Sequence, residues 1–230
     1  MKIIGLLGGM SWESTAEYYR ILNETVKDKL GGLHSAEILL YSVDFEPIEQ
    51  LQRQGDWERA AAILAEGAQR LEQAGADLIL LCTNTMHKVA EEIAAAISIP
   101  FLHIADVTAR AVQQQGLSTV GLLGTRFTME HSFYRERLEQ QGLQVVLPDQ
   151  PSRNEVHRII YEELCLGSVN LDSRKQFTAV MQSLVDQGAQ GIILGCTEIM
   201  LLVKPEDSPV PLFDTTAIHA QAAVELAMQI

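Results

Sequence analysis

The sequence predicts an α/β protein of two similar, pseudo-symmetric lobes. Each lobe is expected to be a parallel sheet flanked by helices, with the functional site in the cleft between the lobes. Three observations support this prediction. Short apolar runs alternate with amphipathic stretches. The 230 residues suit two lobes of about 100 residues each. Several segments of the first half also recur, in the same order, in the second half.

The apolar runs are predicted to be strands that are buried on both faces, because most of them lack polar alternation. These runs are 2–7, 37–43, 78–81, 101–104, 120–123, 145–147, 191–194 and 210–213. Helical patterns lie between them, near 13–29, 57–74, 86–97, 106–115, 128–141, 154–166, 172–187 and 216–229. Alternating β and α elements imply parallel sheets with right-handed crossovers.

The internal repeat divides the chain. The segment 4–8 returns as 120–124, 75–84 returns as 188–197, and 99–101 returns as 210–212. We therefore expect an N-terminal half at 1–115 and a second half at 116–230, and it stays open whether the last helix crosses over. The segment Pro148–Arg153 is predicted to be a loop at a lobe boundary.

The repeat also pairs two polar residues. Aligned from Gly75 and Gly188, Thr83 falls opposite Cys196, and Cys82 falls opposite Gly195. If the halves face each other across a pseudo-twofold axis, Thr83 and Cys196 lie at equivalent strand ends on opposite walls of one cleft. Ligands of open α/β sheets bind at the carboxyl ends of the strands.

Composition excludes several classes of function. The net charge of −13, with no block of basic residues, argues against a nucleic-acid partner. Three widely spaced cysteines without a C-x-x-C motif argue against disulfides and a zinc site, and they suit a reducing cytoplasm. No apolar stretch approaches the roughly 20 residues that span a bilayer, and the first apolar run is too short for a signal peptide. A cytoplasmic protein without a metal or membrane contact is expected.

The two equivalent turns each allow a structural and a functional interpretation. Thr83, Asn84 or Thr85 can cap the next helix, and a helix N-terminus with exposed N–H groups can also bind a carboxylate. His87, one turn further on, is by itself typical of a packed histidine. Cys196 can be a small buried residue, or a thiol whose pKa is lowered at a helix N-terminus.

Two further segments are candidate ligand contacts. The glycines of Gly8–Thr15 suggest close approach of a ligand to the backbone, or else a tight turn in which Ser11 caps the next helix. Their order is not G-x-G-x-x-G, so a dinucleotide site is only weakly supported. The segment 44–56 is predicted to be a long loop, either a solvated turn or a binding loop from which Gln52 or Arg53 reaches a substrate carboxylate.

The motifs Gly8-Gly9-Met10, Thr83–His87 and Gly195–Glu198 resemble those of the aspartate/glutamate racemase superfamily. The branch that they resemble most contains the L-aspartate/glutamate-specific and broad-specificity amino-acid racemases. The resemblance implies a homodimeric isomerase that acts on a small amino acid by a two-base mechanism, without pyridoxal phosphate, another cofactor or a metal. One group removes the α-proton and its partner protonates the opposite face.

The resemblance also implies which residues act. Thr83 and Cys196 are the expected catalytic pair, and the expected substrate-binding residues are Met10, Gln52, Asn84, Thr85, Cys165, Thr197 and Glu198. The family usually has cysteine where this chain has Thr83. Cys82 is displaced by one residue, which turns its side chain to the other face of the strand.

This departure predicts an asymmetric reaction. A thiol has a reference pKa near 8.5, whereas the alkoxide of an alcohol is not normally available. In the family the second-half cysteine faces the α-proton of the L-enantiomer, so the resemblance implies that Cys196 deprotonates L-aspartate or L-glutamate. Because an alcohol is a poor base, we expect Thr83 to protonate the other face, with poor activity on D-substrates.

Three alternatives stay open at this point. The first is another cysteine-dependent chemistry on the same scaffold, as in maleate isomerases, arylmalonate decarboxylases and hydantoin racemases. The second is a non-catalytic amino-acid-binding protein in which Thr83 replaces a lost nucleophile. The third is a hydrolase that pairs Cys196 with His87 or His219, which requires a histidine oriented by a third group.

Overall fold

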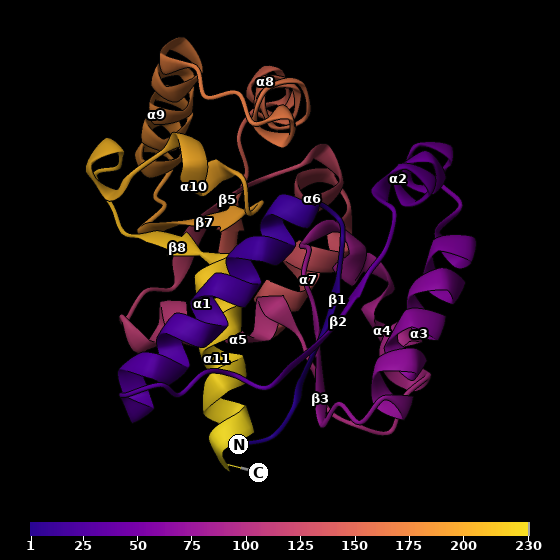
Figure 1. Cartoon of the computed structure of the whole chain (residues 1–230). Helices are drawn as coiled ribbons and strands as arrows, with labels where there is room; N and C mark the ends of the chain where they lie inside the picture. Colours follow the sequence, from indigo (N-terminus) through magenta and orange to yellow (C-terminus); the bar gives the residue numbers. More distant parts are fainter. Residues whose placement is uncertain (230) are drawn as a thin grey trace. The chain divides into compact units, whose positions relative to one another are not determined.

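The computed structural model describes residues 1–229, and the chain divides into two compact units (Figure 1). The first unit contains Met1–Ile104 and the C-terminal residues from Thr216 onward, and the second contains Ala105–Thr215. Compared with the expected halves, 1–115 and 116–230, helix α5 (Ile104–Gln114) falls almost wholly in the second unit, and helix α11 (Thr215–Gln229) falls in the first. The segment 148–153 lies inside the second unit, not at a boundary.

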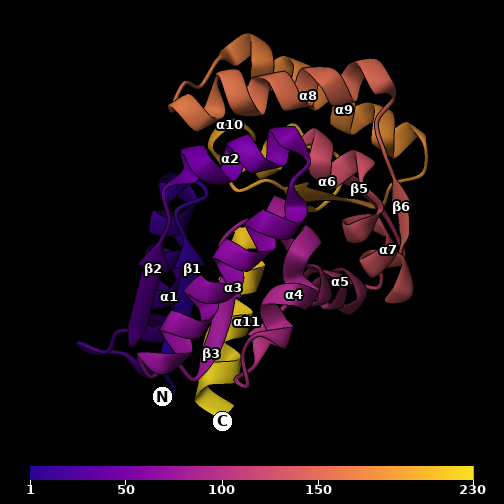
Figure 2. The same ribbon diagram turned by 90° about the vertical axis from the view of Figure 1, so that its right-hand side faces the viewer.

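The first unit is built on a parallel sheet of order β2-β1-β3-β4. Its strands are β1 (Ile4–Gly8), β2 (Ile38–Ser42), β3 (Leu78–Leu81) and β4 (Phe101–Leu102), and its helices are α1 (Trp12–Leu30), α2 (Phe45–Gln54), α3 (Trp57–Gln73), the 3-10 helix η1 (Thr85–Val89), α4 (Ala90–Ala95) and α11. Helices α1 and α11 cover one face of the sheet, and α2 and α3 cover the other (Figure 2).

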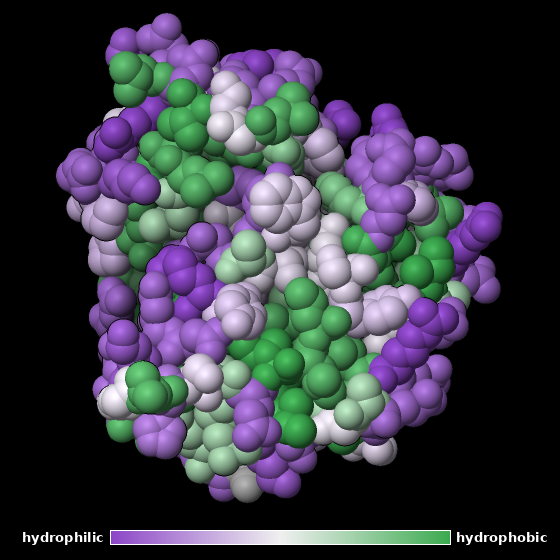
Figure 3. Space-filling view, viewed as in Figure 1, coloured by the Kyte–Doolittle hydropathy of each residue, from purple (hydrophilic) through white to green (hydrophobic). Residues whose placement is uncertain are grey.

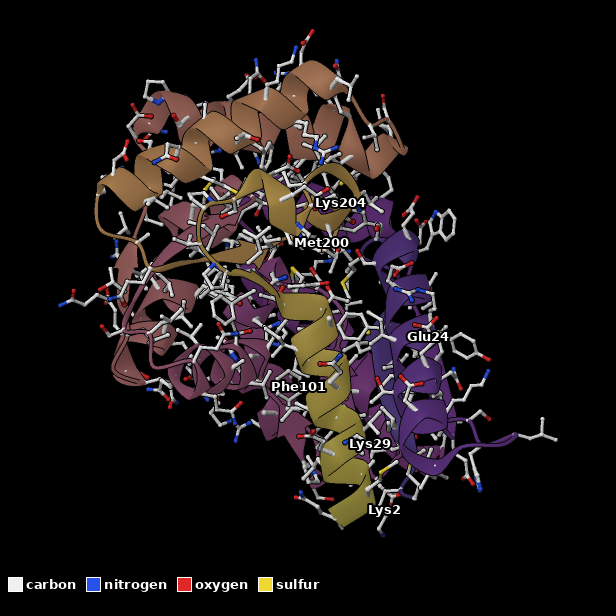
Figure 4. The ribbon with its side chains drawn as sticks, turned by 90° about the vertical axis from the view of Figure 1, so that its left-hand side faces the viewer. Lys2, Glu24, Lys29, Phe101, Met200 and Lys204 are labelled. Atoms are coloured by element: carbon white, nitrogen blue, oxygen red, sulfur yellow. The ribbon has the colours of Figure 1, made fainter. Side chains whose placement is uncertain are left out.

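Side-chain alternation along the central strands of the first unit fills both of these layers. Ile4 and Leu6 of β1 point into the layer of α1 and α11, whereas Leu7 points into the layer of α2 and α3. On the surface of the first layer, Lys29 of α1 forms an ion pair with Glu225 of α11 at 3.5 Å (Figure 4). The central strands are therefore buried on both faces, as their apolar sequences predict.

The second unit repeats this strand order with a parallel sheet β6-β5-β7-β8. Its strands are β5 (Thr119–Gly124), β6 (Gln144–Val146), β7 (Gly191–Gly195) and β8 (Leu212–Asp214), and its other elements are α5, α6 (Arg126–Glu130), α7 (Ser132–Gln140), α8 (Gln150–Glu162), η2 (Leu164–Leu166), α9 (Leu171–Asp186), α10 (Ile199–Leu202) and η3 (Pro205–Asp207). Because both sheets have the same order and direction, the duplication inferred from sequence is confirmed.

All of the predicted strands are present within two residues of their expected ends, but several helices differ. The segment 44–56 is not a loop: Asp44 caps α2 by accepting a hydrogen bond from the Glu46 amide, and Gly55 ends the helix at a φ of 73°. The helix expected at 128–141 is broken at His131 into α6 and α7. The helix expected at 86–97 begins as the 3-10 helix η1.

The surface of the first unit carries hydrophobic side chains beside hydrophilic ones (Figure 3). Leu40 on the edge strand β2 is half-exposed, and Trp12 and Tyr19 of α1 are also exposed. Within residues 1–229, no helix combines the length and hydropathy needed to cross a lipid bilayer.

Candidate active site

The turn after β1 is tightly fixed by its own hydrogen bonds. The Gly9 amide donates to Thr15 Oγ1 at 2.8 Å, and that hydroxyl donates to the Ser11 carbonyl at 2.9 Å. Gly9 has a φ of 95°, and a Cβ there would lie 2.2 Å from the Val43 carbonyl oxygen. Ser11 caps α1, as one of the two interpretations predicted. The turn therefore requires glycine, and Met10 is buried within it.

The turn after β3 holds Thr83 at its backbone. The Thr83 amide donates to the Leu81 carbonyl at 2.9 Å, and the Thr83 carbonyl accepts from His87 Nδ1 at 2.7 Å. The Thr83 side chain is nearly buried, and its hydroxyl makes no hydrogen bond to any of residues 1–229. An alcohol in this state is available to a ligand as a proton donor.

Asn84 and Thr85 are also buried in this turn. Asn84 is the residue that precedes η1, but its side chain makes no capping hydrogen bond there, so the expectation that Asn84 caps the next helix is wrong. The first turn is a 3-10 turn in which the His87 amide donates to the Asn84 carbonyl at 3.1 Å, and the His87 side chain contacts the Thr83 carbonyl. The polar side chain of Asn84 is therefore not explained as a conventional N-cap.

Cys82 lies in the hydrophobic core of the first unit, as the one-residue shift predicts. It is fully buried among residues of the sheet, α1 and α11. Burial raises the pKa of the Cys82 thiol far above its ordinary value. Cys82 is therefore a structural core residue and an unsuitable proton acceptor.

Helix α2 buries one of the two polar residues proposed to reach substrate. Gln52 is 3% exposed, and its Nε2 donates to the Met86 sulfur at 3.0 Å. Its Oε1 is buried and has no hydrogen-bond partner among the described residues. Arg53 is exposed and forms an ion pair with Glu49 at 2.6 Å. Of the two candidates, Gln52 is thus the one with an unsatisfied group.

The turn after β7 places a thiol against a carboxylate. Cys196 Sγ donates to Glu198 Oε2 at 3.0 Å, and the Thr197 hydroxyl donates to the same oxygen at 2.7 Å. Cys196 is 8% exposed and Glu198 is 6% exposed. Glu198 therefore lies in direct contact with both of its neighbours in the motif.

Burial raises the pKa of Cys196 well above its ordinary value, and the negative charge of Glu198 raises it further. The expected lowering of this pKa by a helix N-terminus is therefore wrong. Helix α10, which follows Glu198, has only four residues, so little dipole is available to oppose the effects of burial and of the carboxylate. Burial and the Glu198 carboxylate both favour the neutral form of the Cys196 thiol, and that carboxylate lies within hydrogen-bond distance to accept its proton.

Cys165, in η2, lies beside Cys196. It packs against the same apolar cluster that contains Cys196, and a negative charge on Cys165 would raise the pKa of Cys196 further. The second unit thus brings together Cys165, Cys196, Thr197 and Glu198. The first unit brings Thr83, Asn84, Thr85 and Gln52 into its own sheet-edge region.

The two histidines proposed for a hydrolase are already engaged. His87 Nδ1 contacts the Thr83 carbonyl and its Nε2 accepts from the Ile104 amide at 3.2 Å. His219 Nδ1 contacts the Tyr18 hydroxyl and its Nε2 contacts the Leu102 carbonyl, each at 2.8 Å. Neither imidazole has a nitrogen left to accept a thiol proton, so the structure does not support the Cys–His hydrolase.

Sequence reasoning assigned Glu198 to substrate and did not detect its contact with Cys196. The spacing of Cys196 and Glu198 could have indicated this contact, because a side chain two positions further on can fold back across a short turn. Among residues 1–229, no group of three or more histidine, cysteine, aspartate or glutamate side chains is arranged to hold a metal ion.

Comparison with known proteins identifies the family. Residues 7–223 match the model of the Asp/Glu/Hydantoin racemase family. The chain is 28% identical over 229 residues to the broad specificity amino-acid racemase RacX of Bacillus subtilis (strain 168), covering 96% of each chain.

Two solved structures are similar along their whole length. One, assigned as an Asp/Glu racemase from Yersinia pestis, is 60% identical with a TM-score of 0.94, and coverage is 100% of both chains. The other, an aspartate racemase homologue from Pyrococcus horikoshii OT3, is 36% identical with a TM-score of 0.88 and the same coverage. The chain belongs to the Asp/Glu/Hydantoin racemase family and is an amino-acid racemase.

Proposed function

We propose that this racemase acts without a cofactor and transfers the substrate α-proton through Cys196 on one face and Thr83 on the other. The observation that carries the proposal is the 3.0 Å contact between the Cys196 thiol and the Glu198 carboxylate. The same place in the first half of the repeat holds Thr83, whose hydroxyl has no partner among the described residues. These two groups are chemically suited to the two halves of an inversion.

The reaction begins with the thiol proton. Glu198 accepts it, and the resulting Cys196 thiolate removes the α-proton of the L-enantiomer and becomes a thiol again. Thr83 then donates its hydroxyl proton to the opposite face of the planar carbanion, which gives the D-enantiomer. Finally, Glu198 releases a proton to solvent and the Thr83 alkoxide takes one up, so the enzyme returns to its starting state with no net proton consumed.

The carbanion requires stabilisation because its charge spreads onto the substrate carboxylate. The amides of the turns after Gly8, Thr83 and Cys196, together with the side chains of Asn84 and Thr85, would supply fixed hydrogen-bond donors. The Thr197 hydroxyl bonds to Glu198 and so orients the acceptor of the thiol proton. Fixed donors of this kind replace the electron sink that a cofactor provides in other racemases.

We place the substrate α-ammonium group at Gln52, and not the carboxylate expected from the sequence, because the unpartnered atom of its side chain is an acceptor. A buried carbonyl oxygen without a partner costs about 1–3 kcal/mol. The Oε1 atom of Gln52 is such an oxygen within the described structure. An ammonium donor would satisfy it, so we expect the amide to orient the substrate and to lower KM.

The preferred substrate is proposed to be aspartate or glutamate, with the L-enantiomer as the better proton donor. Enantiomers have equal free energies in solution, so net racemisation must have the same kcat/KM in both directions. The asymmetry between thiol and alcohol instead appears in proton exchange. A carbanion formed from L-substrate returns mostly to Cys196, whereas one formed from D-substrate requires Thr83 to act as the base. Poor activity on D-substrates therefore means slow α-proton exchange and a low kcat with a correspondingly low KM.

A homodimer is proposed from the family resemblance. The edge strand β2 carries a half-exposed Leu40, and exposed edges of this kind pair readily with another chain. We expect a second copy of this chain to cover it. Light scattering should then give twice the mass of one chain for the wild type, and Leu40→Lys should lower that mass.

The test of the proposed function is proton NMR of L- and D-amino acids in heavy water with the purified protein. Loss of the α-proton signal, together with detection of the opposite enantiomer by chiral chromatography of the same sample, supports a racemase. Tight binding of L-glutamate without α-exchange would support an amino-acid-binding protein instead. A product that differs from the substrate in constitution would support another isomerase or a lyase.

A further inference from the structure

The fourth polar side chain in the turn after β3, after those of Thr83, Asn84 and Thr85, is the imidazole of His87, which contacts the backbone of Thr83 and not its side chain. His87 is 3% exposed and its Nε2 accepts a hydrogen bond from the Ile104 amide at 3.2 Å. An amide nitrogen can only donate, so Nε2 carries no hydrogen. The hydrogen of the neutral ring is therefore on Nδ1, where it is donated to the Thr83 carbonyl at 2.7 Å.

These contacts fix both peptide groups on either side of Thr83. The amide of Thr83 is held by the Leu81 carbonyl at 2.9 Å, and its carbonyl is held by His87. With both peptide planes fixed, the direction of the Cα–Cβ bond is fixed as well. The His87 ring packs against the ring of Phe101, with 5.7 Å between the ring centroids (Figure 4). It also packs against the ring of His103, with 4.6 Å between the centroids.

In the second half of the repeat, a different kind of donor holds the carbonyl of the residue equivalent to Thr83. The residue equivalent to His87 is Met200, labelled in Figure 4, which cannot donate a hydrogen bond. There the Cys196 carbonyl accepts from the backbone amide of Ile199 at 3.2 Å. A side-chain donor is therefore specific to the half that carries the alcohol.

We propose that His87 is a positioning residue for the racemisation: as a neutral Nδ1–H imidazole, it aims the Thr83 hydroxyl by holding the Thr83 carbonyl. This inference rests on the proposed function of Thr83 as the proton donor. The alcohol is the weaker partner, so its geometry has to be set more closely than that of the thiol. Misplacement of a reacting group by about 1 Å costs about 10²-fold in rate.

Two substitutions separate the contacts of the ring. An asparagine places its amide nitrogen near the position of Nδ1, so His87→Asn retains a donor for the Thr83 carbonyl. A glutamine places its amide near the position of Nε2, so His87→Gln loses that donor. His219→Gln is the control for a neighbouring contact: the His219 ring packs against the His87 ring, with 5.9 Å between centroids, but it bonds to Tyr18 and Leu102 and not to Thr83.

The experiment measures inversion and α-proton exchange of the L-substrate in heavy water for each variant. We expect His87→Gln to lower the rate of inversion by about 10²-fold, while α-proton exchange through Cys196 persists. His87→Asn and His219→Gln should both keep the wild-type ratio of inversion to exchange. If His87→Gln keeps that ratio, if His87→Asn loses inversion equally, or if His219→Gln changes it as much, the proposal is overturned.

A second measurement does not depend on activity. Nitrogen-15 NMR of histidine-labelled wild-type protein at neutral pH should show the neutral Nδ1–H tautomer for His87 and the neutral Nε2–H tautomer for His219. A charged ring or the Nε2–H tautomer at His87 would overturn the proposal. If Thr83→Val instead leaves inversion unchanged, the proposed function fails, while the tautomer still reports whether His87 holds the Thr83 carbonyl.

Discussion

Glu198→Gln separates two effects that normally change together, the acidity of a thiol and its reactivity in catalysis. In the wild type the carboxylate lies 3.0 Å from Cys196 Sγ and raises the thiol pKa. A neutral amide removes that charge, so the pKa of Cys196 should fall toward its ordinary value. The amide cannot accept the thiol proton as a base, however, so turnover should fall although the thiolate becomes easier to form.

The expected loss follows from the geometry. A proton acceptor at hydrogen-bond distance that acts as a general base contributes about 10²–10⁴-fold, which corresponds to about 3–5 kcal/mol of activation free energy. We therefore expect kcat of Glu198→Gln on the L-substrate to fall by at least about 10²-fold. Because Gln has nearly the same shape as Glu, the site should keep its packing.

The assay combines two measurements on the same variant. The pH dependence of alkylation of Cys196 by iodoacetamide, in a background with Cys165 and Cys82 changed to Ser and Ala, reports the thiol pKa, and initial racemisation rates report turnover. Glu139→Gln is the control, since Glu139 is an exposed glutamate of α7 that contacts Arg135. A lower thiol pKa accompanied by unchanged or higher turnover would refute the role of Glu198 as proton acceptor.

Three further predictions concern Gln52, Thr83 and His219. Gln52→Leu should raise KM about 10-fold with little change in kcat, since about 1–3 kcal/mol of ammonium binding is lost, and initial-rate kinetics measure it. Thr83→Cys should raise kcat and α-exchange for the D-enantiomer, because a thiol is a better base than an alcohol; unchanged D-exchange would contradict this. Burial lowers the pKa of His219 to about 3, below the unfolded value near 6.5. As pH falls from 6.5 toward 3, the unfolded chain binds the proton first, so stability should fall by up to about 1.4 kcal/mol per pH unit. Urea unfolding at pH 7 and pH 5 should show this loss in the wild type and in the exposed-site control His34→Gln, but not in His219→Gln.

The strands could be predicted from the sequence because a strand that is buried on both faces consists of a continuous apolar run between two turns. Helix α2 could not, because Pro47 and several charged residues made 44–56 resemble a loop. Phe45, Ile48 and Leu51 nevertheless lie at helical spacing, and Pro47 is tolerated in the first turn, where its missing N–H has no intrahelical partner.

The residues of the site were largely recognisable from the repeat and the motifs, but their electrostatics were not. The sign of the Cys196 pKa shift depends on how deeply the thiol is buried and on where the Glu198 side chain folds, and neither is a property of local sequence. The same holds for His87, whose second partner, Ile104, is 17 residues away. The pKa of Cys196 and the second hydrogen bond of His87 are therefore set by tertiary contacts. The sequence identified these residues as candidates but did not show those contacts.

The measurement that tests the central claim most directly is the fate of the α-proton of the L-substrate in heavy water, compared between Thr83→Val and Cys196→Ser. If the two residues serve opposite faces, Thr83→Val should stop formation of the D-enantiomer while the L-substrate still gains deuterium with retained configuration. Cys196→Ser should stop both processes. Inversion at the wild-type rate in Thr83→Val, or continued exchange in Cys196→Ser, would contradict the two-face mechanism.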